Sequence, residues 1–135
     1  MKPLFRSAHA VHSLHYHLVL VTKYRKPALN ADLLQRLEAI SAETLRRWCG
    51  ALVEFNGEAD HAHLLIQLPP DAAPSRVIGS LKSRSSRLLR RDYPTHLSRF
   101  YWKPILWSPS YCLVSCGGAP LSVIRQYIEQ QNRPL

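Results

Sequence analysis

The sequence contains little cysteine and no long apolar run, and both absences limit the classes of protein it can belong to. Three cysteines are an odd number and too few for the disulfide scaffold of a small secreted protein, so we expect a reducing, cytoplasmic setting. No apolar run approaches the roughly 20 residues of a membrane span, and the N-terminal residues lack the apolar core of a signal peptide. The glycine-rich loop of nucleotide-hydrolysing enzymes, G-x-x-x-x-G-K-[ST], is also missing.

Acidic residues are scarce as well. Lys and Arg number 18 against 9 Asp and Glu, which gives the 135 residues a formal charge of +9. This balance favours a polyanionic partner bound through phosphate contacts and counterion release, although a merely well-solvated basic protein would carry the same charge. The length fits a single domain over residues 1–135. Residues 1–12 are polar, basic and unpatterned, and we predict that they form a loose arm.

A short apolar segment that begins with two histidines is the most informative stretch. Residues 61–68 read His-Ala-His-Leu-Leu-Ile-Gln-Leu and run into Pro69-Pro70, which cannot continue a sheet ladder, so we predict a buried strand. Alternate residues of a strand face the same way, so His61 and His63 would project side by side while Ala62 faces the core. Such a pair can hold one divalent ion, but two surface histidines that happen to alternate give the same pattern.

A second pair, His15 and His17, begins another predicted strand over 14–22 and competes for the metal role. No carboxylate precedes this pair as Asp60 precedes the first, so the first pair is the stronger candidate. The basic turn that follows could hold phosphates and stack a base on Tyr24, or could simply be solvated. Its cations are Lys23, Arg25 and Lys26.

Two long helices are predicted between the strands. Asn30 is a suitable N-cap for the first helix, which Gly50 ends, and residues 51–59 form the next strand. A second helix, from Pro74, carries six cations and no acid before Asp92, a pattern that favours phosphate binding over simple solvation. These cations are Arg76, Lys82, Arg84, Arg87, Arg90 and Arg91.

Residues 94–110 are predicted to be irregular and rich in aromatic side chains. These side chains either stack unpaired bases or pin the loop itself, and the second interpretation is preferred for Trp107. A strand over 110–116 follows, in which Cys112 and Cys116 are assigned to packing.

A last helix is predicted beyond Gly117-Gly118, and Pro120 opens it. Tyr127 lies at the edge of its apolar stripe, and Gln131 lies one turn further on the same face. The stripe consists of Leu121, Ile124 and Ile128.

The predicted order is strand, helix, strand, strand, helix, strand and a terminal helix. This is the split βαβ pattern of a ferredoxin-like α+β sandwich, an antiparallel sheet with helices on one face. That fold hosts many functions, so the chemistry has to be inferred from the candidate residues.

Five motifs in a fixed order resemble the single-tyrosine HUH transposases, the small transposases of insertion sequences that move as single-stranded DNA. The resemblance covers residues 12–132, with one mild departure at Ala62, where a bulkier apolar residue is more usual. The motifs are YHLV with TKYR (16–25), DHAHLL (60–65), LKS with SSR (81–87), LWSPSY (106–111) and YIE with Gln131 (127–131).

The resemblance implies roles for the matching residues. His61 and His63 match metal-binding histidines, and Gln131 matches a third ligand. Tyr127 matches the nucleophile that forms a 5′-phosphotyrosine link with DNA and releases a free 3′-OH. The resemblance also implies a bacterial or archaeal source and a homodimer, in which the tyrosine helix of one subunit completes the site of the other. This dimer would recognise DNA hairpins at the ends of its insertion sequence.

Physical chemistry is consistent with these roles. A phenol titrates near about pH 10, so Tyr127 needs help as a nucleophile, and a divalent ion that polarises the phosphate would provide it. Imidazole and amide ligands suit Mg²⁺ or Mn²⁺, with Mn²⁺ the better match to nitrogen donors. Zn²⁺ is less favoured because no cysteine lies near either histidine. Exchange of one phosphodiester for another retains the bond energy, so rejoining needs no ATP.

Two other functions stay open. One is a domesticated hairpin-binding protein of this fold that no longer cleaves DNA, although intact candidate residues at 61, 63, 127 and 131 argue against it. The other is a general single-strand or RNA-binding module, which would explain the charge and the aromatic residues. Such a module would not need the pair of Tyr127 and Gln131.

Overall fold

A four-stranded antiparallel sheet is the framework of the molecule. The computed structural model describes residues 5–7, 10–12, 14–116 and 121–131, and the side chains of residues 14–116 and 126–131. The strands of the sheet are β3 (Leu14–Val21), β4 (Ala51–Gly57), β5 (His61–Leu68) and β6 (Cys112–Ser115). The helices are α1 (Ala31–Arg47), α2 (Pro74–Asp92), the short α3 (Pro94–Leu97) and α4 (Leu121–Gln130).

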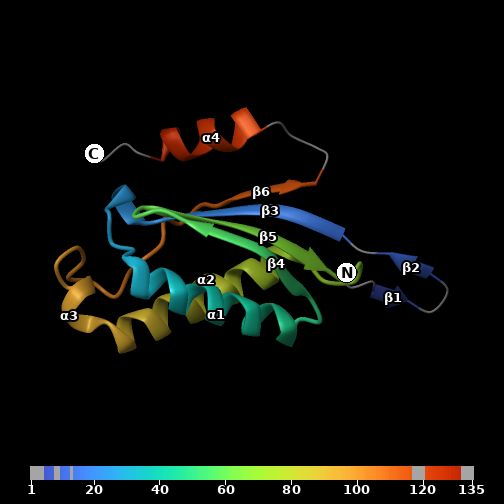
Figure 1. Cartoon of the computed structure of the whole chain (residues 1–135), viewed down its shortest axis with the longest axis horizontal. Coiled ribbons are helices and arrows are strands. Elements are labelled where there is room, and N and C mark those ends of the chain that lie inside the picture. The colour runs from blue at the N-terminus through green and yellow to red at the C-terminus, as the bar shows by residue number, and fades with distance from the viewer. Residues whose placement is uncertain (1–4, 8–9, 13, 117–120, 132–135) are drawn as a thin grey trace.

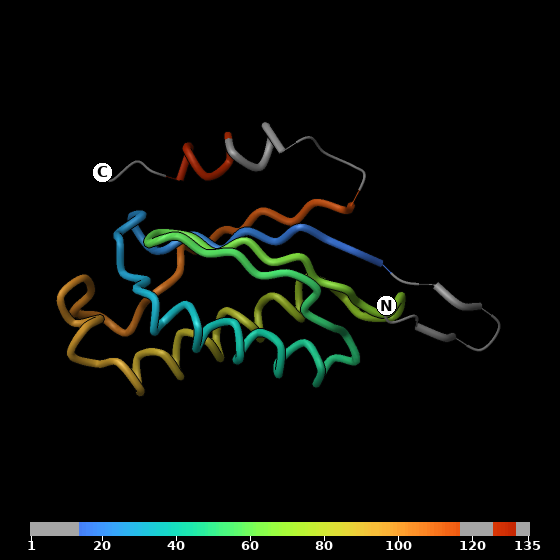
Figure 2. Tube along the Cα trace, viewed as in Figure 1, coloured from blue at the N-terminus to red at the C-terminus, as the bar shows by residue number. Residues whose placement is uncertain are grey.

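The two long helices cover one face of the sheet, and the C-terminal helix covers the other. Figure 1 shows α1 and α2 side by side beneath the strands and α4 above them, and the trace in Figure 2 shows the same layers. The strand order is β4-β5-β3-β6, with every neighbouring pair antiparallel. This is the strand order of a ferredoxin-like sandwich, so the predicted fold class is confirmed.

The strand β5 divides its side chains between the two faces of the sheet. Leu64 is paired with Leu18 of β3, and Ala62 with Leu20, and none of these four side chains is exposed. They belong to one apolar core beneath the sheet, which also contains Ile66. Because side chains alternate along a strand, His61 and His63 project from the opposite face, as predicted.

The helices α1 and α2 fill the core from the other side. The side chain of Asn30 accepts a hydrogen bond of 2.9 Å from the backbone N–H of Leu33, which makes it the predicted N-cap of α1. Pro74 occupies the first turn of α2, as predicted. The buried apolar side chains of the two helices are Leu33, Leu37, Ile40, Leu45, Val77, Ile78, Leu81 and Leu89.

Aromatic side chains pin the loop between α2 and β6, with one clear exception. Trp107 is buried and donates from Nε1 to the Oγ of Ser85 at 3.0 Å, which confirms its predicted structural role. Tyr101 is also buried, and its hydroxyl donates to the backbone oxygen of Lys23 at 2.6 Å. Trp102, in contrast, is 93% exposed.

Within the segment predicted to be a loose arm, the structure describes two short paired strands, β1 (Phe5–Ser7) and β2 (Ala10–His12). Two other sequence predictions about local structure were wrong. Residues 94–97 form α3 within the loop expected to be irregular, since Pro94 is compatible with a first helical turn. Cys116 is exposed rather than packed, because β6 ends at Ser115.

Some predictions fall on residues that are not described. Gly117-Gly118 and Pro120 lie outside the described residues, as do the side chains of Leu121 and Ile124. Within the described part of the apolar stripe, Ile128 packs against Val19 and Val21 of the sheet.

Two glycines make a matched test of the packing at the end of α1. A Cβ on Gly50 would lie 2.5 Å from the backbone oxygen of Gln67, which cannot move without disturbing β5, whereas a Cβ on Gly79 would have no heavy atom within 4 Å. We expect Gly50→Ala to destabilise the fold by about 1–3 kcal/mol. Gly79→Ala in the exposed interior of α2 should stabilise it by about 0.5–1 kcal/mol. Urea unfolding of both variants measures this, and equal midpoints for Gly50→Ala and the natural protein would contradict it.

Candidate active site

The two histidines of β5 lie at the start of the strand on the face away from the long helices. His61 is paired with Val21 and His63 with Val19, both on the neighbouring strand β3. Each histidine is partly buried, while Ala62 between them is completely buried in the core. The structure therefore brings both predicted metal ligands to one face of the sheet.

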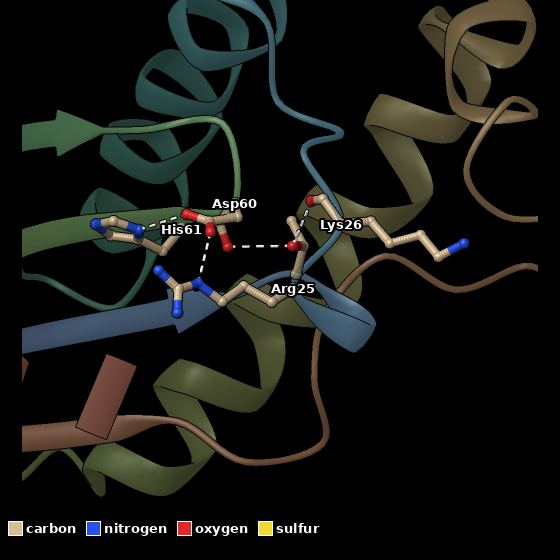
Figure 3. A network of polar contacts seen from close by, with 5 residues as sticks. Arg25, Lys26, Asp60 and His61 are labelled. Carbon is tan, nitrogen blue, oxygen red and sulfur yellow. Dashed lines mark hydrogen bonds and ion pairs between the residues drawn. The ribbon is translucent and has the colours of Figure 1, made fainter. Parts of the chain in front are cut away.

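The ring of His61 is held by a carboxylate and, through it, by an arginine. Nδ1 of His61 lies 2.8 Å from Oδ1 of Asp60, and Nε of Arg25 donates to Oδ2 of the same carboxylate at 2.6 Å (Figure 3). Burial alone would raise the pKa of Asp60, but the hydrogen bonds from His61 and Arg25 outweigh it, so the net pKa is lowered. Arg25 was predicted to bind DNA, and the structure engages its guanidinium with Asp60.

The ring of His63 has a different partner. Its Nε2 lies 2.9 Å from Nδ1 of His17, and the two ring centroids are 5.1 Å apart. Partial burial lowers the pKa of His63, and the neighbouring His17 lowers it further. His17, which was predicted to compete for a metal, thus lies beside the stronger pair rather than at a separate site. No local sequence signal gives this contact, because it depends on the pairing of β3 with β5 and on their register.

The residues Tyr127 and Gln131 meet at a serine of the loop before β6. The hydroxyl of Tyr127 is 2.9 Å from Oγ of Ser110, and that Oγ donates to Oε1 of Gln131 at 3.2 Å. Either hydroxyl can be the donor in the first contact, whereas the amide oxygen of Gln131 can only accept. Ser108 donates to the same Oε1 at 3.2 Å. The sequence did not single out either serine, although both belong to the LWSPSY motif.

The helix α4 brings the tyrosine to the same face of the sheet as the histidines. Tyr127 and Ile128 pack against Val19 and Val21 of β3, next to Cys112 of β6. Neighbouring strands are about 4.8 Å apart, so the apolar surface formed by Val19 and Val21 lies one strand away from the histidines of β5. Burial raises the pKa of Tyr127 despite the hydrogen bond to Ser110, so its phenol is protonated near neutral pH.

Most of the cations predicted to bind DNA on α2 have partners within the chain. Lys82 donates to the backbone oxygens of Ser108 at 2.7 Å and Pro109 at 3.0 Å, and partial burial lowers its pKa. The other α2 contacts join Arg84 to Glu43 and Thr44, Arg90 to Ser86, and Arg91 to Asp92. Arg87 on α2 and Lys26 in the basic turn are exposed, and Lys23 lies over the ring of Tyr24 at 5.1 Å.

The donor set suits a divalent ion that keeps several positions for other ligands. Within the described residues, no group of three or more His, Cys, Asp or Glu side chains could hold a metal. An ion bound by His61 and His63 would therefore take its remaining ligands from an amide such as Gln131, from water or from phosphate oxygens. This mixture of nitrogen and oxygen donors fits Mg²⁺ or Mn²⁺.

Comparison with known families gives a match over nearly the whole chain. Residues 10–131 match the family described as IS200-like transposases. The ISDra2 transposase TnpA of Deinococcus radiodurans is 30% identical over 122 residues, which cover 90% of this chain and 86% of the relative. The IS200 transposase of Salmonella typhimurium is also 30% identical, over 92% of this chain and 80% of its own length.

Solved structures share the fold. A structure from Deinococcus radiodurans R1, assigned as a transposase, superposes with a TM-score of 0.87 at 30% identity and covers 96% of this chain and 99% of its own. A REP-associated tyrosine transposase bound to a REP hairpin superposes with a TM-score of 0.59. It is 13% identical and covers 96% of this chain and 69% of its own, so it supports the fold alone. In the described part of the protein, no helix is both long and apolar enough to cross a membrane.

Proposed function

Because the chain belongs to the IS200-like transposases, which are single-tyrosine HUH transposases, we propose that it cleaves and rejoins single-stranded DNA at the ends of an insertion sequence through a 5′-phosphotyrosine intermediate. One observation carries the proposal. The residues that match the nucleophile and the metal ligands, Tyr127, His61, His63 and Gln131, all lie on the sheet face that α1 and α2 leave uncovered.

In the proposed reaction, the oxygen of Tyr127 attacks the phosphorus of one phosphodiester. A bond forms between phosphorus and the tyrosine oxygen while the bond to the 3′-oxygen breaks. The 3′-oxygen takes a proton and leaves as a free 3′-OH, and the phenolic proton is lost to the surroundings. Rejoining is the reverse reaction with another 3′-OH as nucleophile, so one phosphodiester is exchanged for another without ATP.

Three residues are proposed as ligands of the divalent ion. His61 and His63 would hold a Mg²⁺ or Mn²⁺ ion, with Gln131 as the third protein ligand. A bound divalent ion supplies positive charge to the scissile phosphate and to the leaving oxygen. The amide oxygen of Gln131 accepts hydrogen bonds from both Ser108 and Ser110, so metal binding through this oxygen would compete with these two contacts.

Single-stranded DNA is proposed to lie along the end of the sheet where β5 begins. The backbone N–H of Thr22, just before the turn at residues 23–25, donates to the carbonyl oxygen of Asp60. The N–H of Lys23, within the turn, donates to the carbonyl oxygen of Leu106 in the aromatic loop. That loop and turn expose two aromatic rings, Trp102 at 93% and Tyr24 at 51%, beside Lys23, Lys26 and Lys103. Exposed rings among cations are the usual means of holding unpaired bases. The hairpin bound to the REP-associated transposase motivates a hairpin ligand here as well, with Arg87, Arg90 and Arg91 as candidate contacts.

The adduct between protein and DNA tests the proposed chemistry directly. Tyr127→Phe removes one oxygen and little volume, so it should retain the fold and DNA binding but form no covalent adduct with a cleaved strand. His61→Ala should also prevent cleavage, because it removes a metal ligand while leaving the phenol in place. Labelled single strands from the flanks of the gene, incubated with Mg²⁺ or Mn²⁺ and run on a denaturing gel, measure this, and a chelator should abolish the adduct.

A neighbouring tyrosine provides the matched control. Tyr111→Phe also loses one phenolic oxygen near the same loop, and it should still form the adduct. An adduct that persists in Tyr127→Phe would assign the nucleophile to another tyrosine, with Tyr111 and Tyr101 the first to examine. No adduct from the natural protein on any flanking strand would favour a hairpin-binding protein that does not cleave.

A homodimer with sites completed by the partner is the second part of the proposal, and mixing inactive variants tests it. In the single chain α4 lies over its own sheet, so cleavage in cis is the alternative. If the tyrosine helix acts on the partner, a mixture of Tyr127→Phe and His61→Ala contains heterodimers with one intact composite site. At random 1:1 mixing, about a quarter of the natural adduct should return, because half of the dimers are mixed and one site in each is intact. A mixture as inactive as its components would indicate cis cleavage.

Salt dependence separates the two proposed DNA surfaces. Lys23→Gln with Lys26→Gln should weaken binding of an unpaired strand and lower the slope of log K against log salt by about 0.7 for each lost contact. Arg87→Gln with Arg91→Gln should instead act on a hairpin, by about 0.9 for each contact. Arg46→Gln, an exposed cation on α1, is the control and should change neither slope. Fluorescence anisotropy at several salt concentrations measures both, and an unchanged slope removes the corresponding surface from the proposal.

A further inference from the structure

The carboxylate of Asp60 joins His61 to Arg25 and uses a different oxygen for each. Oδ1 faces Nδ1 of His61 at 2.8 Å, and Oδ2 accepts from Nε of Arg25 at 2.6 Å. Figure 3 shows the carboxylate between the ring on β5 and the arginine on the turn after β3. The side chains of Asp60 and Arg25 are only 22% and 20% exposed, so water competes weakly for these contacts.

This arrangement selects one tautomer of the His61 ring. An ionised carboxylate is only an acceptor, so Nδ1 of His61 must carry the proton and donate it. In the neutral ring the lone pair then lies on Nε2, which points away from Asp60 and is the atom free to bind a metal. Histidine ligands of metals in proteins commonly donate their second N–H to a carboxylate, which fixes the ring orientation and makes the ligand more basic.

The backbone of the turn that carries Arg25 has an unusual conformation and is hydrogen-bonded to Asp60. Tyr24 and Arg25 both have left-handed backbone conformations, with φ of 59° and 52°, which side chains other than glycine seldom adopt. The backbone N–H of Thr22 donates to the carbonyl oxygen of Asp60 at 3.0 Å, and the hydroxyl of Thr22 lies between the carbonyl oxygens of Asp60 and Lys26 at 3.1 and 2.7 Å. The backbone of Asp60 and the arginine that grips its side chain therefore belong to one hydrogen-bonded unit.

The second histidine lacks this support. His63 has the ring of His17 as its partner, and two neutral imidazoles can exchange donor and acceptor roles. Of the two candidate metal ligands on β5, His61 is thus the one whose tautomer is fixed by a carboxylate.

We propose that Asp60 and Arg25 are positioning residues for His61. Arg25 orients the carboxylate of Asp60, and Asp60 keeps His61 in the Nδ1–H tautomer with Nε2 directed at a divalent ion. This role rests on the proposed function of His61 as a metal ligand. It also gives Arg25 a task other than the DNA contact expected from the sequence.

The test uses the full-length protein without DNA and has two readouts. Mn²⁺ binding is followed by electron paramagnetic resonance of the free ion, and the imidazole tautomers of the metal-free protein by long-range ¹H–¹⁵N NMR above the pH range in which histidine is charged. The variants are Asp60→Ala, Asp60→Asn, Arg25→Gln and His61→Ala. The matched control is Asp92→Ala, which breaks comparable ion pairs with Arg36 and Arg91 at the end of α2.

Asp60→Ala should weaken Mn²⁺ binding by about 10- to 100-fold and convert the His61 signals from the Nδ1–H form to a mixture with the Nε2–H form. Asp60→Asn retains an acceptor oxygen but not the charge, so it should keep the tautomer and lose part of the affinity. Arg25→Gln should also fall between the natural protein and Asp60→Ala. Asp92→Ala should change neither readout, and circular dichroism checks that each variant is folded.

The outcomes separate this inference from the function on which it rests. Unchanged Mn²⁺ binding in His61→Ala would reject the metal role itself. Loss of binding in His61→Ala, together with natural affinity and the natural tautomer in Asp60→Ala, would leave the metal role intact and overturn the positioning role. If Asp60→Ala does not fold, Asp60→Asn and Arg25→Gln decide, and natural behaviour of both would overturn the inference.

Discussion

The pairing register between β3 and β5 is the constraint on which the rest of the site depends. In the observed register Leu18 meets Leu64 and Val19 meets His63, so the apolar residues of both strands share the face that α1 and α2 cover. A slip of β5 by one residue would turn His63 into the core and expose Leu64 to solvent. Burying a leucine side chain is worth about 1.5–3 kcal/mol, and several core positions would be lost together, so the register is strongly specified. The hydrophobic core thereby decides where the histidines point.

The strand β3 has apolar residues on both faces, and this gives α4 its place. Leu18 and Leu20 belong to the main core. Val19 and Val21 form a smaller apolar surface on the opposite face, and Tyr127 packs against it. In the proposed mechanism, Tyr127 has to lie near the proposed metal ligands yet remain able to reach a strand of DNA. The small apolar surface of Val19 and Val21, one strand away from the histidines, suits this requirement. Few contacts have to be broken there for α4 to move or to exchange with a partner.

The Lys and Arg side chains differ in whether they have a partner within the chain. On α2, Lys82 and Arg84 are tied to the loop at 108–109 and to Glu43 of α1, so part of the basic helix serves the fold. At the turn after β3, Arg25 is engaged by Asp60, whereas Lys26 is exposed. A count of cations therefore overestimates the surface available to phosphates, since each cation with an internal partner has already exchanged much of its hydration for a protein contact.

The sequence alone was sufficient for the fold class, the N-cap at Asn30, the strand at residues 61–68 and the common face of its histidines, because periodicity and capping are local properties. Its ordered motifs also led to the correct family. Three-residue strands at 5–7 and 10–12 and the four-residue α3 escaped prediction, since so few residues carry no readable period. The tertiary structure alone decided that His17 meets His63, 46 residues away, and that Arg25 meets Asp60, 35 residues away. Local patterns determine which face of a strand a side chain occupies, but its neighbour on that face depends on which strands pair and how the turns between them close.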